Sequence, residues 1–256
     1  MSKVRVLILC APGTNCDVET AFAFEQAGAV TNSVYIGELI RHEKQLSDYQ
    51  IMVIPGGFTY GDDISAGKVL ANELKTKLGE DVKRFVEKGG LVLGICNGFQ
   101  VLVKAGILPE PSNNGLPSLT LSANDSGKFE CRWVHLWVNQ ESTCVFTKGI
   151  THLYLPVAHG EGKVVAAPEA LPRLNVVLYY GDECGNIKAS YPHNPNGSVV
   201  NIAGICDSSG RIFALMPHPE RHIHGIQHPQ WTRQGIRRCG DGFQIFANAV
   251  QWAQRL

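Results

Sequence analysis

One cysteine of the chain lies in a setting that suits a nucleophile. Cys96 follows the buried apolar run Leu91–Ile95 and precedes a helical pattern that starts at Asn97, with Gly94 and Gly98 two residues away on either side. This glycine spacing is that of a nucleophile elbow, a strained strand-to-helix turn where larger neighbours would clash. The helix N-terminus favours the thiolate, and the Asn97 N–H is directed to where an oxyanion would form. The pattern therefore predicts a nucleophile rather than a core cysteine.

The base for this thiol is expected in a distant part of the chain, and His218 is the strongest candidate among nine histidines. It ends a predicted strand, and prolines on both sides fix its backbone. Glu220 follows two residues later, so in extended chain both side chains lie on one face. A carboxylate there can hold one imidazole nitrogen and leave the other for the thiol, as in a catalytic triad. His159 and Glu161 form a second candidate pair, which ranks lower because no prolines flank it.

The remaining cysteines and histidines give weaker signals. No two of the eight cysteines form a C-x-x-C pair, so a zinc ribbon is not expected, and Cys16 and the other six are interpreted as free thiols buried as small hydrophobes. His222, His224 and His228 are close in sequence, but their spacing matches no standard zinc pattern. We interpret them as part of a solvated loop, and we expect no metal site.

The elements that must position these residues alternate, before residue 106, between strand and helix signals. Strands, several of them continuous apolar runs typical of a sheet covered on both faces, are expected at Val4–Cys10, Val30–Ile36, Ile51–Pro55 and Leu91–Ile95. Helices are expected at Val18–Ala27, with Asn15 or Asp17 as the cap, and at Ile64–Leu74, Asp81–Lys88 and Asn97–Ala105. This order predicts an α/β fold with a parallel sheet and helices on both faces.

The second half of the chain is richer in strands. Pro109–Asp125 is interpreted as a loop, because it is rich in Pro, Ser, Asn and Gly. Strands are expected at Cys131–Val138, Leu153–Val157, Val176–Tyr180, Val199–Cys206 and Arg211–Met216, the last two joined as a hairpin by Ser208–Gly210. A helix over Phe243–Arg255, capped by Asp241, ends the chain. We expect one α/β domain over residues 1–256 with a β-rich second half.

Composition excludes several classes of protein. Lys and Arg number 23, as do Asp and Glu, and this zero net charge argues against a general nucleic-acid binder, which needs a basic surplus. The apolar run Val6–Ala11 is shorter than the roughly 7–15 residues of a signal-peptide core. No run approaches the roughly 20 apolar residues of a membrane-spanning helix. We therefore expect a cytoplasmic protein that binds neither nucleic acid nor membrane.

Five segments together resemble the class I, or triad, glutamine amidotransferases: Gly56–Gly67, Gly94–Gln100, Ala158–Gly162, Tyr191–Ser198 and Met216–Arg221. They run through nearly the whole chain. Other triad amidotransferases usually carry Leu and His where this chain has Asn97 and Phe99, and the resemblance narrows to the branch that supplies ammonia in the purine pathway. It implies a flavodoxin-like fold with a mostly parallel central sheet flanked by helices.

The resemblance also implies roles for individual residues. Cys96 would attack the side-chain amide of L-glutamine, His218 would carry the proton to the leaving ammonia, and Glu220 would orient His218. Backbone N–H groups of Gly57 and Asn97 would hold the oxyanion of the thioester intermediate, and water would release glutamate. The expected substrate-binding residues are Gly57, Phe58, Asn97 and Gln100.

The ammonia would pass to a large partner synthetase, accompanied by a small third subunit, that uses ATP and Mg²⁺ to convert formylglycinamide ribonucleotide to the amidine. No G-x-x-x-x-G-K-[ST] loop occurs here, so we expect no cofactor in this chain and the nucleotide on the partner. Six arginines and two acids in Arg211–Leu256 make a candidate docking surface. Two alternatives stay open. One is a DJ-1-like cysteine hydrolase. The other is a non-catalytic flavodoxin-like module in which Gly13 or Gly56-Gly57 would bind a phosphate group at the end of a strand.

Overall fold

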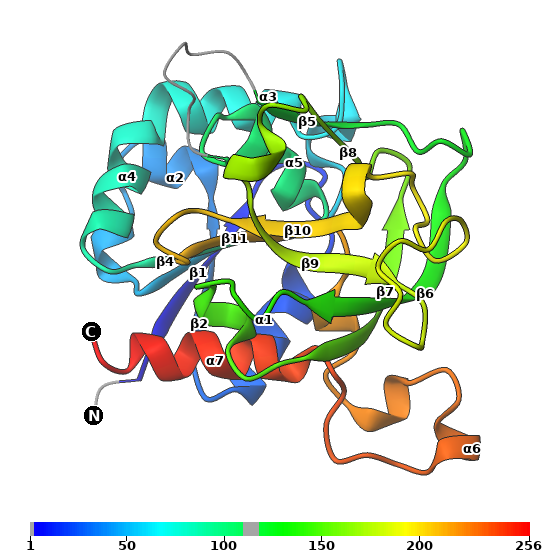
Figure 1. Ribbon diagram of the computed structural model, residues 1–256. Coiled ribbons are helices and arrows are strands. Elements are labelled where there is room, and N and C mark those ends of the chain that lie inside the picture. The colour runs from blue at the N-terminus through cyan, green and yellow to red at the C-terminus, as the bar shows by residue number, and fades with distance from the viewer. Residues whose placement is uncertain (1–2, 110–117) are drawn as a thin grey trace.

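The central sheet has nine strands in the order β2-β1-β3-β4-β11-β10-β9-β6-β7. Figure 1 shows this sheet crossing the molecule in the computed structural model. The structure describes residues 3–109 and 118–256. The five parallel strands are β2 (Val30–Tyr35), β1 (Arg5–Cys10), β3 (Ile51–Ile54), β4 (Leu91–Ile95) and β11 (Ile212–Leu215). The antiparallel continuation is β10 (Ile202–Cys206), β9 (Asn175–Gly181), β6 (Glu130–Val138) and β7 (His152–His159). The predicted fold class is confirmed.

The innermost parallel strands are apolar throughout because both of their faces are covered. Every residue of β3, β4 and β11 is buried, as expected for a sheet between two helical layers. Ser208–Gly210 joins β10 to β11 in the predicted hairpin, whose strands pair antiparallel. That hairpin carries the chain from the antiparallel part back to the parallel part, where β11 lies beside β4.

Helices cover both faces of the sheet (Figure 1). On one face α1 (Asp17–Gln26) packs along α7 (Phe243–Ala253), with the rings of Phe24 and Phe246 5.0 Å apart. The other face carries α3 (Lys68–Glu73), α4 (Gly79–Glu87) and α5 (Asn97–Lys104). The short helix α2 (Ile36–Ile40) follows β2 and contacts the segment Leu74–Leu78, which joins α3 to α4, whereas α6 (Trp231–Gln234) lies apart from both layers. In the described ranges no helix is both long and apolar enough to cross a membrane.

Two predictions about the first and middle parts of the chain were wrong in detail. The helix expected at Ile64–Leu74 starts only at Lys68, because Ile64 and Gly67 have φ of 72° and 71°, outside helical backbone. It then continues through a π-turn at Leu74–Leu78 into α4. Part of the loop expected at Pro109–Asp125, residues 110–117, lies outside the described residues.

The remainder of that predicted loop contains a strand. β5 (Leu119–Ser122) pairs antiparallel with β8 (Lys163–Ala166) in a separate two-stranded sheet. Alternate residues of β5, Leu119 and Leu121, are buried, so the strand is held by its apolar face despite polar neighbours.

Neither predicted helix cap is present. Helix α1 starts after Cys16, which makes no side-chain cap bond, so neither Asn15 nor Asp17 caps it. Helix α7 starts after Gly242. The carboxylate of Asp241 instead accepts a hydrogen bond from the backbone N–H of Tyr154 at 2.9 Å. The carboxylate of Asp241 is thus engaged by a residue 87 positions away and does not cap its own helix.

Candidate active site

The predicted functional residues lie at one edge of the sheet, where parallel strands end. Cys96 follows β4, Gly56 and Gly57 follow β3 by two and three residues, and His218 follows β11 by three. The carboxyl ends of neighbouring parallel strands meet at the same edge, which is where ligands bind in open α/β sheets. Residues more than 100 positions apart are thereby brought together.

The backbone at Cys96 is that of a strained elbow. Its φ and ψ are 50° and −102°, and α5 begins at the next residue. A Cβ at Gly98 would lie 2.0 Å from the carbonyl oxygen of Ile54, and one at Gly94 2.8 Å from that of Gly98. The clash that the glycine spacing predicted is therefore present, on both the strand side and the helix side.

His218 and Glu220 form a buried pair beside this elbow. The His218 Nδ1 lies 2.6 Å from Glu220 Oε1, and both side chains are almost fully buried. The backbone N–H of His218 donates to Pro156 O at 2.8 Å, and Pro219 opens a single 3-10 turn that brings Glu220 back to the ring. Because a carboxylate only accepts, Nδ1 carries the proton and Nε2 is the nitrogen left for the thiol.

Burial and charge act on His218 in opposite directions. Burial lowers the pKa of its imidazole, but the negative charges of Glu220 and of a Cys96 thiolate raise that pKa well above its ordinary value. The His218 Nε2 makes no hydrogen bond, and the Cys96 thiol donates to Ala158 O at 3.7 Å. Catalytic hydrogen bonds are often loose before substrate is bound, so this geometry suits a thiol that transfers its proton on attack.

The backbone at Gly57, the first predicted oxyanion donor, has room only for glycine. Its φ is 146°, and a Cβ there would lie 2.8 Å from the backbone nitrogen of Asn15. The second predicted donor, the Asn97 N–H, belongs to the first turn of α5, whose N–H groups have no partner in the helix. Phe58 is half exposed, with its ring 6.4 Å from that of Phe129.

The side chains of Asn97 and Gln100 connect the elbow helix to two loops. Asn97 Oδ1 accepts from the Thr59 hydroxyl at 2.7 Å, and its Nδ2 donates to Gln100 Oε1 at 2.9 Å. Gln100 Nε2 in turn donates to Glu161 O at 2.5 Å. Both side chains are buried. A role of Gln100 in binding glutamine stays a prediction, and the amide is already engaged with the loop that carries Glu161.

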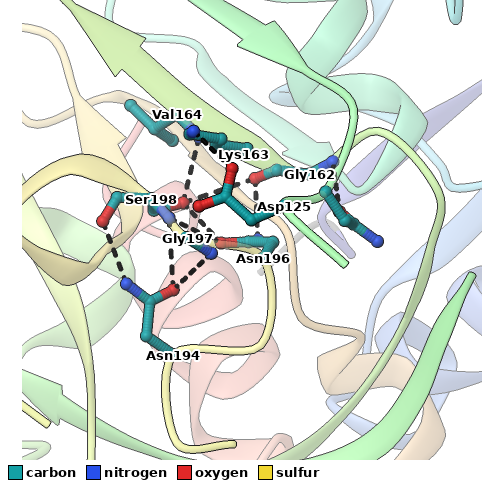
Figure 2. Close-up of polar contacts among 9 residues, drawn as sticks. Asp125, Gly162, Lys163, Val164, Asn194, Asn196, Gly197 and Ser198 are labelled. Carbon is teal, nitrogen blue, oxygen red and sulfur yellow. Dashed lines mark hydrogen bonds and ion pairs between the residues drawn. The ribbon is translucent and has the colours of Figure 1, made fainter. Parts of the chain in front are cut away.

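A polar network of three loops supports the residues around Gly162 (Figure 2). Asn196 Nδ2 donates to Gly162 O at 2.8 Å, and Ser198 Oγ accepts from the Val164 N–H at 3.0 Å and donates to Asn196 Oδ1. Lys163 and Asp125 close the outer side as an ion pair. The segment Tyr191–Ser198, whose role the sequence left open, thus anchors the loop that Gln100 contacts.

His159 and His222 are both buried. The Nδ1 of His159 lies 3.1 Å from Asn124 Oδ1, and its Nε2 is buried without a partner. Burial, followed by the nearby charge of His218, lowers the pKa of His159 to about 4. His222, expected in a solvated loop, is buried with Nδ1 2.8 Å from Tyr154 O, so that expectation was wrong for it.

Cys16 is the site residue that the sequence analysis missed. Its sulfur, a His218 nitrogen and a Glu220 oxygen all lie within 4.8 Å of one another. Among the described residues, these three side chains are also the group whose spacing could bind a metal ion. The Arg221 guanidinium already donates to the same sulfur at 3.1 Å, and a positive charge there opposes cation binding. No local pattern around Cys16 could have revealed contacts made some 200 residues away.

Comparisons with known proteins identify the family of the chain. Residues 3–253 match the family model of the CobB/CobQ-like glutamine amidotransferase domain. The chain is 59% identical to phosphoribosylformylglycinamidine synthase subunit PurQ of Dehalococcoides mccartyi, over 100% of both chains. It is 44% identical to the protein of the same name from Methanococcus maripaludis, over 97% of each chain.

Solved structures extend the comparison to three dimensions. A chain in the structure of PurLQS from Thermotoga maritima superposes with a TM-score of 0.76 at 32% identity, covering 98% of this chain and 99% of that one. A glutamine amidotransferase from the same organism has a TM-score of 0.53 at 16% identity, covering 91% of this chain and 83% of that one. The second likeness concerns the fold alone.

Proposed function

The chain belongs to the CobB/CobQ-like glutamine amidotransferase family, and on that premise we propose that Cys96, His218 and Glu220 are its catalytic triad for hydrolysis of L-glutamine. It is a glutaminase subunit of phosphoribosylformylglycinamidine synthase and acts in purine biosynthesis. A DJ-1-like hydrolase and a non-catalytic flavodoxin-like module are set aside, because the family and the relatives both point to glutamine chemistry.

The reaction begins at the elbow. Cys96 Sγ attacks the side-chain carbonyl carbon of glutamine, and the thiol proton passes to His218 Nε2. The carbonyl oxygen becomes negative and faces the N–H groups of Gly57 and Asn97. His218 then gives its proton to the amide nitrogen, the C–N bond breaks, and ammonia leaves a γ-glutamyl thioester on Cys96.

Water completes the cycle through the same residues. It attacks the thioester carbon while His218 Nε2 takes its proton, the C–S bond breaks, and the proton returns to the Cys96 sulfur as glutamate leaves. The observation that carries this proposal is the buried 2.6 Å contact between His218 and Glu220 beside the elbow. The carboxylate stabilises the imidazolium that forms at each step, and in the neutral imidazole it keeps the proton on Nδ1.

The ammonia is consumed outside this chain. We infer that it passes to the synthetase partner, PurL, with PurS as the third component, and that ATP and Mg²⁺ act there. No phosphate-binding G-x-x-x-x-G-K-[ST] loop occurs in this sequence. Residues 1–256 then work as one class I glutamine amidotransferase domain, with Phe58 and Gln100 at the glutamine side of the elbow.

Two substitutions in the assembled complex test the triad. We expect His218→Ala to lower glutamine-dependent synthesis by about 10²–10⁴-fold, because it removes the proton carrier, and Glu220→Ala to be milder. Synthesis supplied with free ammonia serves as the control and should survive both changes. Full glutamine-dependent activity in His218→Ala would refute the proposed triad.

A further inference from the structure

Cys16 lies beside the histidine and the carboxylate of the proposed triad. It lies between β1 and α1 and is buried. Its sulfur accepts a hydrogen bond from Arg221 Nη2 at 3.1 Å and donates one to Asn15 Oδ1 at 3.3 Å. A neutral thiol can donate once and accept at the same time, so both contacts are satisfied together. The side chain therefore acts as a polar link, in contrast to the core thiol that the sequence suggested.

The link ends at the carboxylate that orients the catalytic base. Arg221 Nε lies 3.9 Å from Glu220 Oε1 and 3.7 Å from Glu19 Oε1. The second carboxylate oxygen of Glu220 is buried without a hydrogen-bond partner. Burying a charged carboxylate costs free energy unless a positive charge stays close. The position of the Arg221 guanidinium therefore affects how well the charge of Glu220 is stabilised. The hydrogen bond from Arg221 to the buried Cys16 sulfur holds the guanidinium in this position.

The backbone of Cys16 contacts the other half of the site. Its N–H donates to Gly56 O at 3.2 Å. The peptide between Gly56 and Gly57 is trans, so its C=O and N–H point in opposite directions. The hydrogen bond from Cys16 therefore also fixes the direction of the Gly57 N–H, the proposed oxyanion donor.

The fit between these segments leaves little freedom. A Cβ on Gly56 would lie 3.1 Å from the Cys16 sulfur and 2.8 Å from Cε1 of His218. The turn at residues 13–16, the Gly56–Gly57 peptide and the His218 ring are thus in direct contact. A shift of any one of them is transmitted to the others.

We propose that Cys16 is a positioning residue that joins the two halves of the active site, holding Arg221 against Glu220 through its sulfur and the Gly56–Gly57 peptide through its N–H. This inference rests on the proposed glutaminase function. It assigns no bond-making step to Cys16, whose effect is exerted through Glu220 and Gly57.

Substitutions at position 16 separate this role from simple packing. We expect Cys16→Ala to lower kcat for glutamine hydrolysis by the assembled complex at least tenfold, with KM changed less than threefold. Cys16→Ser should recover most of the rate, because a hydroxyl can also accept from Arg221 and donate to Asn15. A purely apolar core role predicts the reverse order, because serine buries a polar group where alanine does not. Alanine as active as wild type, or more active than serine, would overturn the proposal.

A double-mutant cycle gives a second test, because Arg221→Ala removes the same contact from its other side. Arg221 is half exposed, so Arg221→Ala should fold, and we expect it to lower kcat by a similar factor. The double variant should lose no more than either single variant, because both remove the same contact. Multiplicative losses would overturn the proposed link. Cys206→Ala, which removes a buried thiol from β10, is the matched control and should retain wild-type kcat.

Failure of this inference is distinguishable from failure of the proposed function. Cys96→Ala should abolish glutamine hydrolysis whatever the role of Cys16. If it does, and Cys16→Ala keeps full kcat, the positioning role alone is refuted. If Cys96→Ala keeps hydrolysing glutamine, the triad assignment is refuted, and the positioning role with it.

Discussion

The buried imidazole of His159 gives a quantitative prediction about stability and pH. Its pKa lies at about 4 in the folded protein, because burial removes the hydration of the charged form and the charge of His218 opposes a second one. In the unfolded chain the same group has the ordinary value of 6.5. Below that pH the unfolded chain binds a proton that the folded chain does not.

The sign and size of the effect follow from this difference. The full contribution to stability is present above pH 6.5 and is lost progressively as the pH falls from 6.5 toward 4. At 1.36 kcal/mol per pKa unit, the free energy of unfolding should fall by about 2 kcal/mol between pH 7 and pH 5 on account of His159 alone.

The substitution His159→Asn isolates this contribution. The asparagine amide can donate to Asn124 Oδ1, as the His159 Nδ1–H does, but it does not titrate. Urea unfolding followed by tryptophan fluorescence between pH 5 and pH 8 measures both proteins. We expect the stability advantage of wild type over the variant to shrink by about 2 kcal/mol as the pH falls from 7 to 5.

The control and the refuting result use the same assay. His42 is exposed and has a left-handed backbone that asparagine tolerates, so His42→Asn should follow the wild-type pH dependence. A constant stability difference between wild type and His159→Asn from pH 8 to pH 5 would show that burial does not hold His159 neutral. The reasoning about charge beside His218 would then fail.

Three further predictions concern the elbow and the loops around it. A glutamine-like chloroketone should alkylate Cys96 ahead of the other seven thiols; peptide mass mapping checks this, and labelling spread over the exposed cysteines would contradict it. Gly98→Ala places a Cβ 2.0 Å from Ile54 O and should lower the free energy of unfolding by about 1–3 kcal/mol and abolish hydrolysis; an unchanged thermal midpoint would be inconsistent with the clash. Asn196→Leu removes the hydrogen bond to Gly162 O and should raise KM for glutamine several-fold in steady-state assays. Ammonia-dependent synthesis by the complex should be unchanged. An unchanged KM would argue against support of the glutamine site by this loop.

The parts of the site that were predictable from sequence are those encoded within a few residues. The elbow at Cys96 has its strand, its glycines and its helix in one ten-residue stretch. The pair of His218 and Glu220 is likewise local, because two prolines restrict the backbone that positions both. Local spacing and backbone restriction were sufficient for these features.

The features that sequence reasoning missed depend on long-range contacts. Cys16 resembles any buried thiol until Arg221, 205 positions later, is placed against it. Asp241 has the character of a helix cap, but the backbone N–H of Tyr154 competes for its carboxylate. Strand β5 is polar on alternate residues and becomes a strand only where β8 pairs with it. In each case tertiary structure overrides the local preference.

The position of β11 next to β4 has a consequence for the order in which activity appears during synthesis. The strand that precedes the proposed nucleophile is complete by residue 95, but its neighbour on one side is made only at residues 212–215. Contacts with such a large sequence separation form late in folding, because a long loop must close first. A nascent chain that has released its first 200 residues therefore holds Cys96 without His218, and its thiol lacks the proposed base. With the proposed triad, we expect no hydrolysis of glutamine until almost the whole chain has folded.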